Sequence, residues 1–396
     1  MKILRVISST NPEKGGPIEG IKQSQSILSD MGIEVEIACC DDPGAPWLKD
    51  NRLPTVHALG PATGNYGYTS RITDWLRENH SQFDAVIIHG LWQFHGLAVH
   101  RVLAGTTTPY FVFPHGMLDP WFKKTYPLKH LKKWLYWPWA EYRILRDAQA
   151  VIFTCEDERL LARKSFWLYK ANEMVTAYGT SSPPQDELKL REEFLTKHPE
   201  LRGKRLVLFL SRIHEKKGCD LLIDAFAKVA SSDNRLHLVI AGPDQTGWKA
   251  ELQKQAERLG ISHRITWPGM LQGGDKWGAY YSAEVFCLPS HQENFGIVVA
   301  EALACGKPVL LSNKVNIWRE IEQDNSGFIA EDSVEGTEKN LNNWLALSET
   351  EYETMRARAK QSFYSRFHIY RAVERLIEII NPATPPIISK NNHATS

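Results

Sequence analysis

The chain has 396 residues, of which 43% are hydrophobic and 23% charged, and its formal net charge is +1. This length exceeds one compact domain of ordinary size and predicts two domains. The near-neutral charge gives no global electrostatic argument for nucleic-acid binding, so any basic patch must be local. No apolar run approaches the roughly 18 residues that a membrane-spanning helix needs.

The N-terminal segment MKILRVISS is interpreted as a first strand rather than a signal peptide, because Ser8 and Ser9 interrupt its apolar run. The six cysteines show no metal-ligand or redox spacing, and most lie in apolar strand or helix patterns. They are interpreted as reduced core thiols, which favours a cytoplasmic protein.

Short β-branched runs alternate with amphipathic helices along the chain, a pattern typical of α/β proteins with parallel sheets. Strands are predicted at 2–8, 34–40, 84–89, 109–114 and 150–155, and again at 205–211, 236–242, 264–269, 284–289, 308–312 and 327–330. The predicted units are a Rossmann-like lobe at 1–178, a linker at 179–204, a second lobe at 205–366, a helix at 367–382 and a disordered tail at 383–396. Whether that last helix crosses back to the first lobe stays open.

The loops after the strands are the places where ligands bind in such sheets. The first strand runs into STNPEKGGP, where Gly15 and Gly16 precede Pro17 at a favourable first helical turn. Two glycines let the backbone approach a ligand, and the helix N-terminus that follows can face a phosphate. A tight structural turn explains this segment equally well.

Two histidines end or follow neighbouring strands of the first lobe. His89 lies in IIHGLW and His115 follows FVFP, and both are expected to face the cleft. A structural histidine with satisfied hydrogen bonds is the commoner fate of such a residue. Trp92 either stacks on a sugar ring or fills the core, and the sequence does not decide between these roles.

Residues 121–139, WFKKTYPLKHLKKWLYWPW, interleave five lysines with aromatic residues. Such a segment can lie on an anionic membrane surface with its aromatic side downward. It can also be an ordinary helix that packs through its Trp and Leu side chains with lysines outward, and this interpretation is favoured.

In the second lobe, LFLSRIHEKKG places Arg212 just after a strand and Lys217 five residues later, beside Gly218. An arginine fork and a lysine point charge together can neutralise most of a diphosphate without a metal ion. Taken alone, each charge is more simply a solvated surface group. The functional interpretation gains weight because the next loop belongs to the same edge of the sheet.

That next loop begins the segment HQENFGIVVAEALACGKPVLLS, residues 291–312, which places Glu293 and Glu301 at either end of one predicted helix. Their spacing corresponds to roughly 12 Å along a helix axis and about 80° in azimuth, so both carboxylates are expected to face one crevice. The exposed helix N-terminus favours an anion. The alternative is a helix with one Glu stabilising its dipole and the other on a solvated face.

In this order, the motifs resemble those of the family 4 glycosyltransferases, which are retaining, metal-independent enzymes of the GT-B fold. The resemblance covers nearly the whole chain. It rests on the stretch from Glu293 to Glu301, the Arg212 and Lys217 pair, the Gly15-Gly16 loop and the segment PHG at His115. It implies an α/β protein of two Rossmann-like lobes facing a central cleft, with the acceptor on the first lobe and a nucleoside diphosphate sugar on the second.

The resemblance also implies a role for each residue. Arg212 and Lys217 would hold the diphosphate, with Gly15 and Gly16 across the cleft, and His115 would lie near the reacting sugar. Glu293, Asn294, Phe295, Gly296 and Ile297 would hold the donor sugar, Glu301 the ribose, and Met270 and Leu271 the base, while Gly242 would allow close approach. His89 and Trp92 are acceptor-side candidates. Glu293, Arg212, Lys217 and His115 are the candidate catalytic residues.

The expected function is transfer of a hexose from a nucleoside diphosphate sugar, with UDP-glucose as first choice, to a saccharide or lipid-linked saccharide in polysaccharide biosynthesis. No cofactor or metal is expected, because no D-x-D pair follows a strand of the first lobe. Nucleic acid is not an expected partner, and peripheral membrane contact through residues 121–139 stays open. The alternatives are a non-catalytic sugar-nucleotide-binding protein and a sugar-nucleotide epimerase of the same fold.

Overall fold

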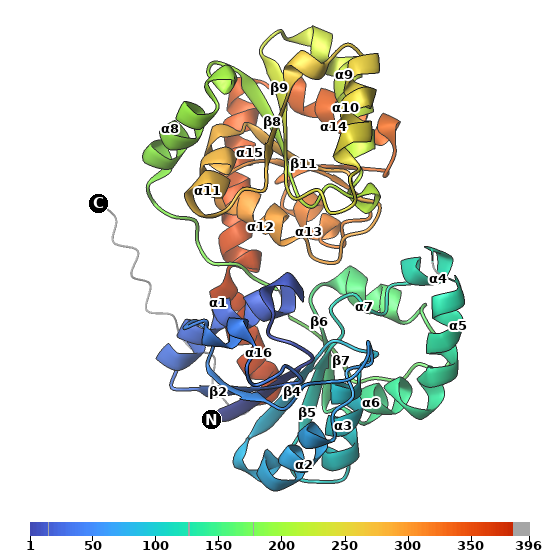
Figure 1. The fold of residues 1–396 in the computed structure, drawn as a ribbon. Coiled ribbons are helices and arrows are strands. Elements are labelled where there is room, and N and C mark those ends of the chain that lie inside the picture. The colour runs from blue at the N-terminus through green and yellow to red at the C-terminus, as the bar shows by residue number, and fades with distance from the viewer. Residues whose placement is uncertain (15, 126, 177, 383–396) are drawn as a thin grey trace. The chain divides into compact units, whose positions relative to one another are not determined.

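The computed structural model describes residues 1–14, 16–125, 127–176 and 178–382. Contacts divide the chain into two units, which are residues 1–179 with the segment from Ile369 onward, and residues 180–368. Each unit has one parallel sheet with helices packed around it (Figure 1). The prediction of two Rossmann-like α/β lobes is confirmed.

The sheet of the first lobe has the strand order β3-β2-β1-β4-β5-β6-β7. Its strands are β1 (Lys2–Ile7), β2 (Glu34–Cys39), β3 (Thr55–Ala58), β4 (Ala85–His89), β5 (Tyr110–Phe113), β6 (Ala150–Phe153) and β7 (Glu173–Val175). The order reverses between β1 and β4, so the loops that follow these two strands flank the switch point where open α/β sheets bind ligands.

The helices of the first lobe cover both faces of this sheet. They are α1 (Gly16–Asp30), α2 (Ser70–Asn79), α3 (Phe94–Leu103), α4 (Trp121–Thr125), α5 (Pro127–Tyr136), α6 (Glu141–Asp147), α7 (Glu156–Ala162) and α16 (Ile369–Ile380). The last of these presents Ile369, Val373, Leu376 and Ile377 at helical spacing to a core that includes Phe111 of β5. The C-terminal helix is thus part of the first lobe's core.

The second lobe has the strand order β10-β9-β8-β11-β12-β13. Its strands are β8 (Arg205–Leu210), β9 (Leu236–Ala241), β10 (Ile265–Gly269), β11 (Val285–Leu288), β12 (Val309–Ser312) and β13 (Gly327–Ala330). Its helices are α8 (Glu187–Lys197), α9 (Cys219–Val229), α10 (Lys249–Arg258), α11 (Gly273–Ser282), α12 (Ile297–Ala304), α13 (Trp318–Gln323), α14 (Val334–Leu345) and α15 (Glu349–Ser362). Its switch point lies between β8 and β11.

The segment 179–204, predicted as a linker, contains a helix of the second lobe. Helix α8 packs so closely on α11 that a side chain at Gly278 would meet the carbonyl oxygen of Leu190 at 2.4 Å, and Phe194 is fully buried. The Gly, Ser and Pro signals at 179–184 hid the helical pattern that follows them. The short strands β3 and β7 escaped prediction because neither is a continuous apolar run.

The favoured interpretation of residues 121–139, packing through Trp and Leu with lysines outward, holds for Trp137 and for the exposed Lys123, Lys129 and Lys132 but is wrong for the leucines. The segment forms α4, α5 and a 3₁₀ turn, and Trp137 is buried in that turn, but α5 has no buried residue among those described and its leucines point outward. Three further predictions concern the cysteines, the membrane-spanning helices and the C-terminal tail. All six cysteines are buried free thiols. No helix in the described ranges is long and apolar enough to cross a membrane, and the tail 383–396 lies outside the described residues.

Candidate functional site

Two loops of the second lobe meet at its switch point. Gly218, which follows the loop after β8, has a φ of 69°, and a side chain there would meet the carbonyl oxygen of Pro289 after β11 at 2.3 Å. Hydrogen bonds from Ser290 and from the amide of His291 to the carbonyl of Lys216 also join the loops, each at 2.9 Å. This close approach brings together side chains that lie far apart in the sequence.

The side chains that meet there are Lys217 and Glu293, which form an ion pair and a direct hydrogen bond from Nζ to Oε2. Lys217 is only 5% exposed. Burial by itself would raise the pKa of Glu293, but the charge and hydrogen bond of Lys217 outweigh it, so the pKa lies below its ordinary value. The carboxylate of Glu293 is therefore ionised near neutral pH.

Glu293 does not lie on the helix predicted for it. Helix α12 begins at Ile297, after Gly296 with a φ of 73°. Glu293 lies in the preceding loop, where its amide donates to Lys314 (3.0 Å) and its carbonyl accepts from the amide of Asn316 (3.0 Å). These two backbone bonds bind the loop to the segment after β12, so the spacing worked out for a continuous helix does not apply.

Glu301 lies within α12 and is buried. Its Oε1 accepts from Lys276 Nζ at 2.6 Å, and Tyr280 lies 3.1 Å from its Oε2 through its hydroxyl. Both partners come from α11, one helical turn apart. Sequence reasoning missed them, although a lysine and a tyrosine four residues apart on one helix face are a readable signal.

The other second-lobe candidates lie around the same edge of the sheet. Arg212 is exposed just after β8 and forms no ion pair with the residues described. Gly242 follows β9, and a side chain there would meet the carbonyl oxygen of Ser211 at 1.7 Å, which explains the glycine without a ligand. Met270, which is exposed, and Leu271 follow β10.

The residues from Asn294 to Ile297 differ in which of their groups, backbone or side chain, are available to a ligand. The side-chain oxygen of Asn294 accepts from Asn316 at 3.4 Å. Phe295 is buried with its ring 5.8 Å from that of Phe367, so only its backbone is available to a ligand. Gly296 and Ile297 open the helix, whose first amides lack intrahelical partners.

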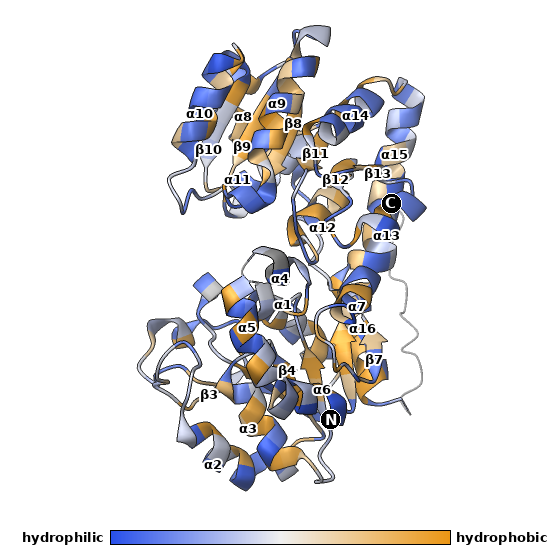
Figure 2. Cartoon of the chain, turned by 90° about the vertical axis from the view of Figure 1, so that its right-hand side faces the viewer, coloured by the Kyte–Doolittle hydropathy of each residue, from blue (hydrophilic) through white to orange (hydrophobic). Residues whose placement is uncertain are grey.

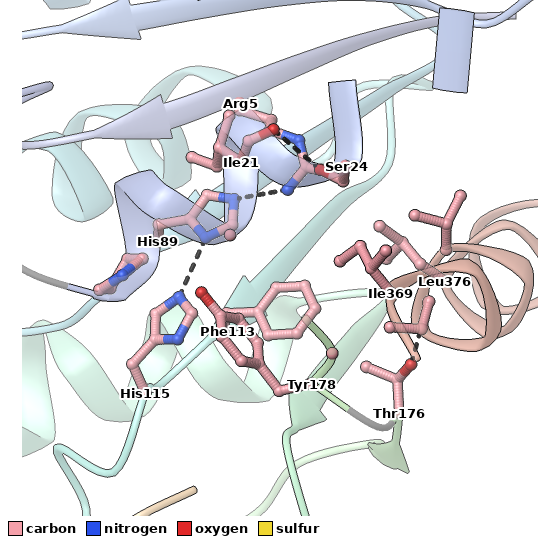
Figure 3. Close-up of a pocket in the computed structure, with 15 residues that line it drawn as sticks. Arg5, Ile21, Ser24, His89, Phe113, His115, Thr176, Tyr178, Ile369 and Leu376 are labelled. Carbon is pink, nitrogen blue, oxygen red and sulfur yellow. Dashed lines mark hydrogen bonds between the residues drawn. The ribbon is translucent and has the colours of Figure 1, made fainter. Parts of the chain in front are cut away.

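In the first lobe, a chain of polar side chains crosses β1, β4 and the loop after β5 (Figure 3). The guanidinium of Arg5 lies 3.4 Å from His89 Nε2, and His89 Nδ1 lies 3.0 Å from His115 Nε2. The rings of His89, Phe113 and His115 are stacked at centroid distances of 5.3–5.5 Å. Sequence reasoning found both histidines but missed Arg5, whose charge inside a buried strand is itself an unusual signal.

Burial and the neighbouring charge of Arg5 lower the pKa of His115 to about 3 and the pKa of His89 well below its ordinary value. Both imidazoles are therefore neutral near pH 7. Because arginine only donates hydrogen bonds, His89 must accept at Nε2 and donate from Nδ1 to His115. Because Nε2 of His115 accepts this bond, the proton of the neutral ring is on Nδ1. His115 is thus held in one tautomer, and its Nδ1 is a hydrogen-bond donor.

The backbone of the first-lobe site is held in unusual conformations. His115 has a φ of 51° and Trp92 a φ of 69°, both rare outside glycine. Glu158 fixes the first by accepting from the amide of Gly116 at 2.5 Å, and Glu141 fixes the second by accepting from the amide of Trp92 at 2.6 Å. Buried carboxyl groups thus stabilise both turns, and burial raises the pKa of Glu141 to about 8.

The indole of Trp92 is partly buried and packs against the core of the first lobe. Its ring lies 5.3 Å from Phe166 and 6.0 Å from Trp137, with Lys133 Nζ 4.6 Å from its centroid. The sequence had left this choice open. Gly16 begins α1, where a side chain would meet nothing within 4 Å, and its carbonyl accepts from Tyr178 at 2.6 Å. Gly15 lies outside the described residues.

Parallel-sheet lobes of this kind, with charged residues in the loops at their switch points, are typical of GT-B glycosyltransferases. Residues 191–362 match the family of glycosyl transferases group 1, and residues 15–179 match the glycosyl transferase 4-like domain. The chain therefore belongs to the group 1, or family 4, glycosyltransferases.

Individual relatives are similar over part of the chain. An uncharacterized glycosyltransferase of Methanocaldococcus jannaschii, MJ1607, is 33% identical over 125 residues, 32% of this chain and 31% of that protein. The mannosylfructose-phosphate synthase of Agrobacterium fabrum is 30% identical over 133 residues, 32% of this chain and 29% of that protein. The chain spans under half the length of these curated relatives.

A similarity of fold extends over nearly the whole chain. The crystal structure of Anabaena HepE in complex with UDP and glucose matches with a TM-score of 0.73 at 18% identity, covering 96% of this chain and 100% of that one. This match supports the GT-B fold, and the predicted fold and family are both confirmed.

Proposed function

We propose that the protein transfers a hexose from a nucleoside diphosphate sugar to a saccharide or lipid-linked saccharide acceptor in polysaccharide biosynthesis. The observation that carries this proposal is the ion pair of Lys217 with Glu293 at the switch point of the second lobe. UDP-glucose is the first donor to test, because HepE, which shares the fold, has been crystallised with it.

The chemistry requires charge stabilisation at two places. As the glycosyl phosphate bond breaks, negative charge develops on the diphosphate and positive charge on the sugar ring. In this proposal Lys217 and Arg212 neutralise the diphosphate, and the carboxylate of Glu293 lies against the sugar. The ammonium of Lys217, fixed by Glu293, and the exposed guanidinium of Arg212 then do the work that a divalent ion does in other transferases. Retention of configuration is proposed from the resemblance to the family.

Each part of the donor is assigned to other residues of the second lobe. Glu301 holds the ribose, the backbone from Asn294 to Ile297 holds the sugar hydroxyls, and Met270 with Leu271 contacts the base. Glu301 is already oriented by Lys276 and Tyr280, so a ribose hydroxyl would meet a carboxylate that does not have to be ordered on binding.

The first lobe is proposed to bind the acceptor. His115 would donate a hydrogen bond from Nδ1 to a sugar oxygen as a neutral imidazole, with His89 and Arg5 fixing its tautomer. The buried free thiols favour a cytoplasmic location for the enzyme.

The alternatives make different predictions for one set of measurements. A non-catalytic binding protein would bind nucleotide sugars without turnover, and an epimerase would change the donor sugar without an acceptor. We would screen nucleoside diphosphate sugars by thermal shift, then follow transfer to saccharide acceptors and assign the anomeric configuration of the product by NMR. Release of diphosphate only in the presence of acceptor supports transfer. Binding without any release, or sugar interconversion without acceptor, contradicts it.

The assay needs a matched pair of variants. Lys217→Met removes the buried ammonium, whereas Lys254→Met removes an exposed lysine of α10 in the same lobe. Transfer should be lost in the first variant and kept in the second. Equal activity in both would contradict the proposed role of the switch-point pair.

A further inference from the structure

Helix α5 exposes the side chains that an amphipathic helix normally buries. Leu128, Leu131 and Leu135 are 79%, 55% and 61% exposed. Their spacing of three and four residues places them on one face of the helix. In Figure 2 the ribbon of α5 carries both hydrophobic and hydrophilic colours. Exposed leucines in a continuous row are unusual on a soluble surface and mark a binding face.

The rotation of α5 is fixed by contacts on its other face. The ring of His130 stacks on Phe166 at 4.9 Å, and Lys133 Nζ lies 4.6 Å from the centroid of Trp92. Burial lowers the pKa of Lys133. His130 and Lys133 therefore face the first lobe, and the leucines of α5 face away from it. Those leucines are free to contact a binding partner.

Exposed tryptophans extend this row. The rings of Trp134 and Trp167 lie 6.3 Å apart, and both are exposed, as is Trp139. Together with Leu128, Leu131 and Leu135 they form what we call the α5 face. Tryptophan is enriched at the level of lipid headgroups because its ring is apolar and its N–H is polar.

The charged side chains within residues 121–140 are all basic. Lys123, Lys129 and Lys132 are exposed, and residues 121–140 contain no aspartate or glutamate. A protein-binding surface of this size would be depleted of lysine at its centre, whereas lysines beside apolar side chains suit anionic headgroups above acyl chains. We propose that the α5 face binds the surface of an anionic lipid bilayer, with leucines and tryptophans in the headgroup region and lysines among the lipid phosphates.

Vesicle co-sedimentation tests this proposal without donor or acceptor, so its failure is separate from failure of the proposed function. The full chain should bind vesicles of phosphatidylcholine with 30% phosphatidylglycerol, bind pure phosphatidylcholine at least tenfold more weakly, and be released by 0.5 M NaCl. The content of anionic lipid is roughly physiological, and the salt concentration strongly screens electrostatic attraction. Equal binding to both vesicles, or binding to neither, overturns the proposal.

The leucines are tested by Leu131→Ser combined with Leu135→Ser. Loss of two buried leucines from the bilayer should lower partitioning at least tenfold. The matched control is Leu188→Ser, which changes a leucine on α8 that is 78% exposed and should leave partitioning unchanged. Because all three leucines are exposed, the variants should fold normally. Circular dichroism spectra and melting temperatures that match those of the original chain check this. Partitioning that survives the double variant places the contact elsewhere and overturns the proposal.

The lysines are tested by Lys123→Gln combined with Lys132→Gln. Each lysine near an anionic surface contributes about fivefold, so the pair should lower partitioning about 25-fold. Lys254→Gln combined with Lys339→Gln removes the same two charges from exposed positions of the second lobe and should leave partitioning unchanged. If both pairs lower partitioning equally, the attraction is not specific to the α5 face and the proposal is overturned. If the leucine variant instead abolishes a dimer seen by light scattering, the α5 face binds a second copy.

Discussion

Replacing Lys217 by Met removes the buried positive charge that pairs with Glu293 at the switch point of the second lobe. Glu293 then keeps its burial but loses the charge that holds its pKa down, so that pKa should rise. Removing one partner of a buried ion pair costs about 3–5 kcal/mol. Because the carboxylate side chain is 20% exposed, we expect the lower part of this range or less, about 2–3 kcal/mol.

The effect on turnover is larger than the effect on stability. One fixed group that stabilises developing charge is worth about 10²–10³ in turnover number. Lys217→Met should therefore lower turnover about 100-fold or more at saturating donor. Glu293→Gln should also lower it, and the double variant should lose less than the product of the two effects because the groups act as a unit.

The assay is a double-mutant cycle on Lys217→Met and Glu293→Gln, with urea unfolding and turnover measured at pH 7. Since the folded pKa of Glu293 is depressed, the stability from the pair is present above the ordinary carboxyl pKa and is lost as pH falls through the folded value. The coupling energy in unfolding should therefore shrink at acid pH. Additive stability effects at pH 7, or turnover of a folded Lys217→Met variant within threefold of the original, would refute the reasoning.

Three further outcomes are expected. Turnover should be unchanged in excess chelator, and loss that manganese or magnesium restores would contradict the charge scheme. Glu301→Gln should weaken calorimetric binding of nucleoside diphosphate roughly 10- to 100-fold, whereas Glu257→Gln, at an exposed position of α10, should not; equal affinities would remove the ribose role. Burial lowers the pKa of His95 to about 4 and the pKa of His115 to about 3, so each should cost about 2 kcal/mol of unfolding free energy as pH falls from 7 to 5. Urea titrations should show this loss, and His95→Gln should reduce it; a variant with the same pH dependence as the original chain would contradict the assignment.

The sequence predicted the strands that are buried on both faces, because a continuous run of β-branched residues has few other ways to fold. It failed where a tertiary contact decides the conformation. Glu293 looked like a helix residue because a helix follows it closely, but backbone bonds to Lys314 and Asn316 hold it in a loop. No local pattern records a partner twenty residues away.

The candidate site was predicted in part. The placement of Arg212, Lys217 and His115 in loops after strands could be predicted from the sequence, since strand ends are where α/β sheets place polar groups; their chemical roles stay predictions. The contact of Lys217 with Glu293 could not, because it depends on how closely two loops approach at Gly218. For residues 121–139 the amphipathic pattern was visible, but the pattern does not say which face meets the protein.

The position of α16 in the core of the first lobe determines the order in which the two lobes can fold during synthesis. A ribosome releases the residues of β1, β5 and β6 long before Ile369 exists, so the surface that Phe111 shares with α16 waits uncovered while the whole second lobe is made. The second lobe, continuous in sequence, can finish folding first. A nascent chain stopped before residue 369 would keep that apolar surface open, which makes it a natural substrate for a chaperone.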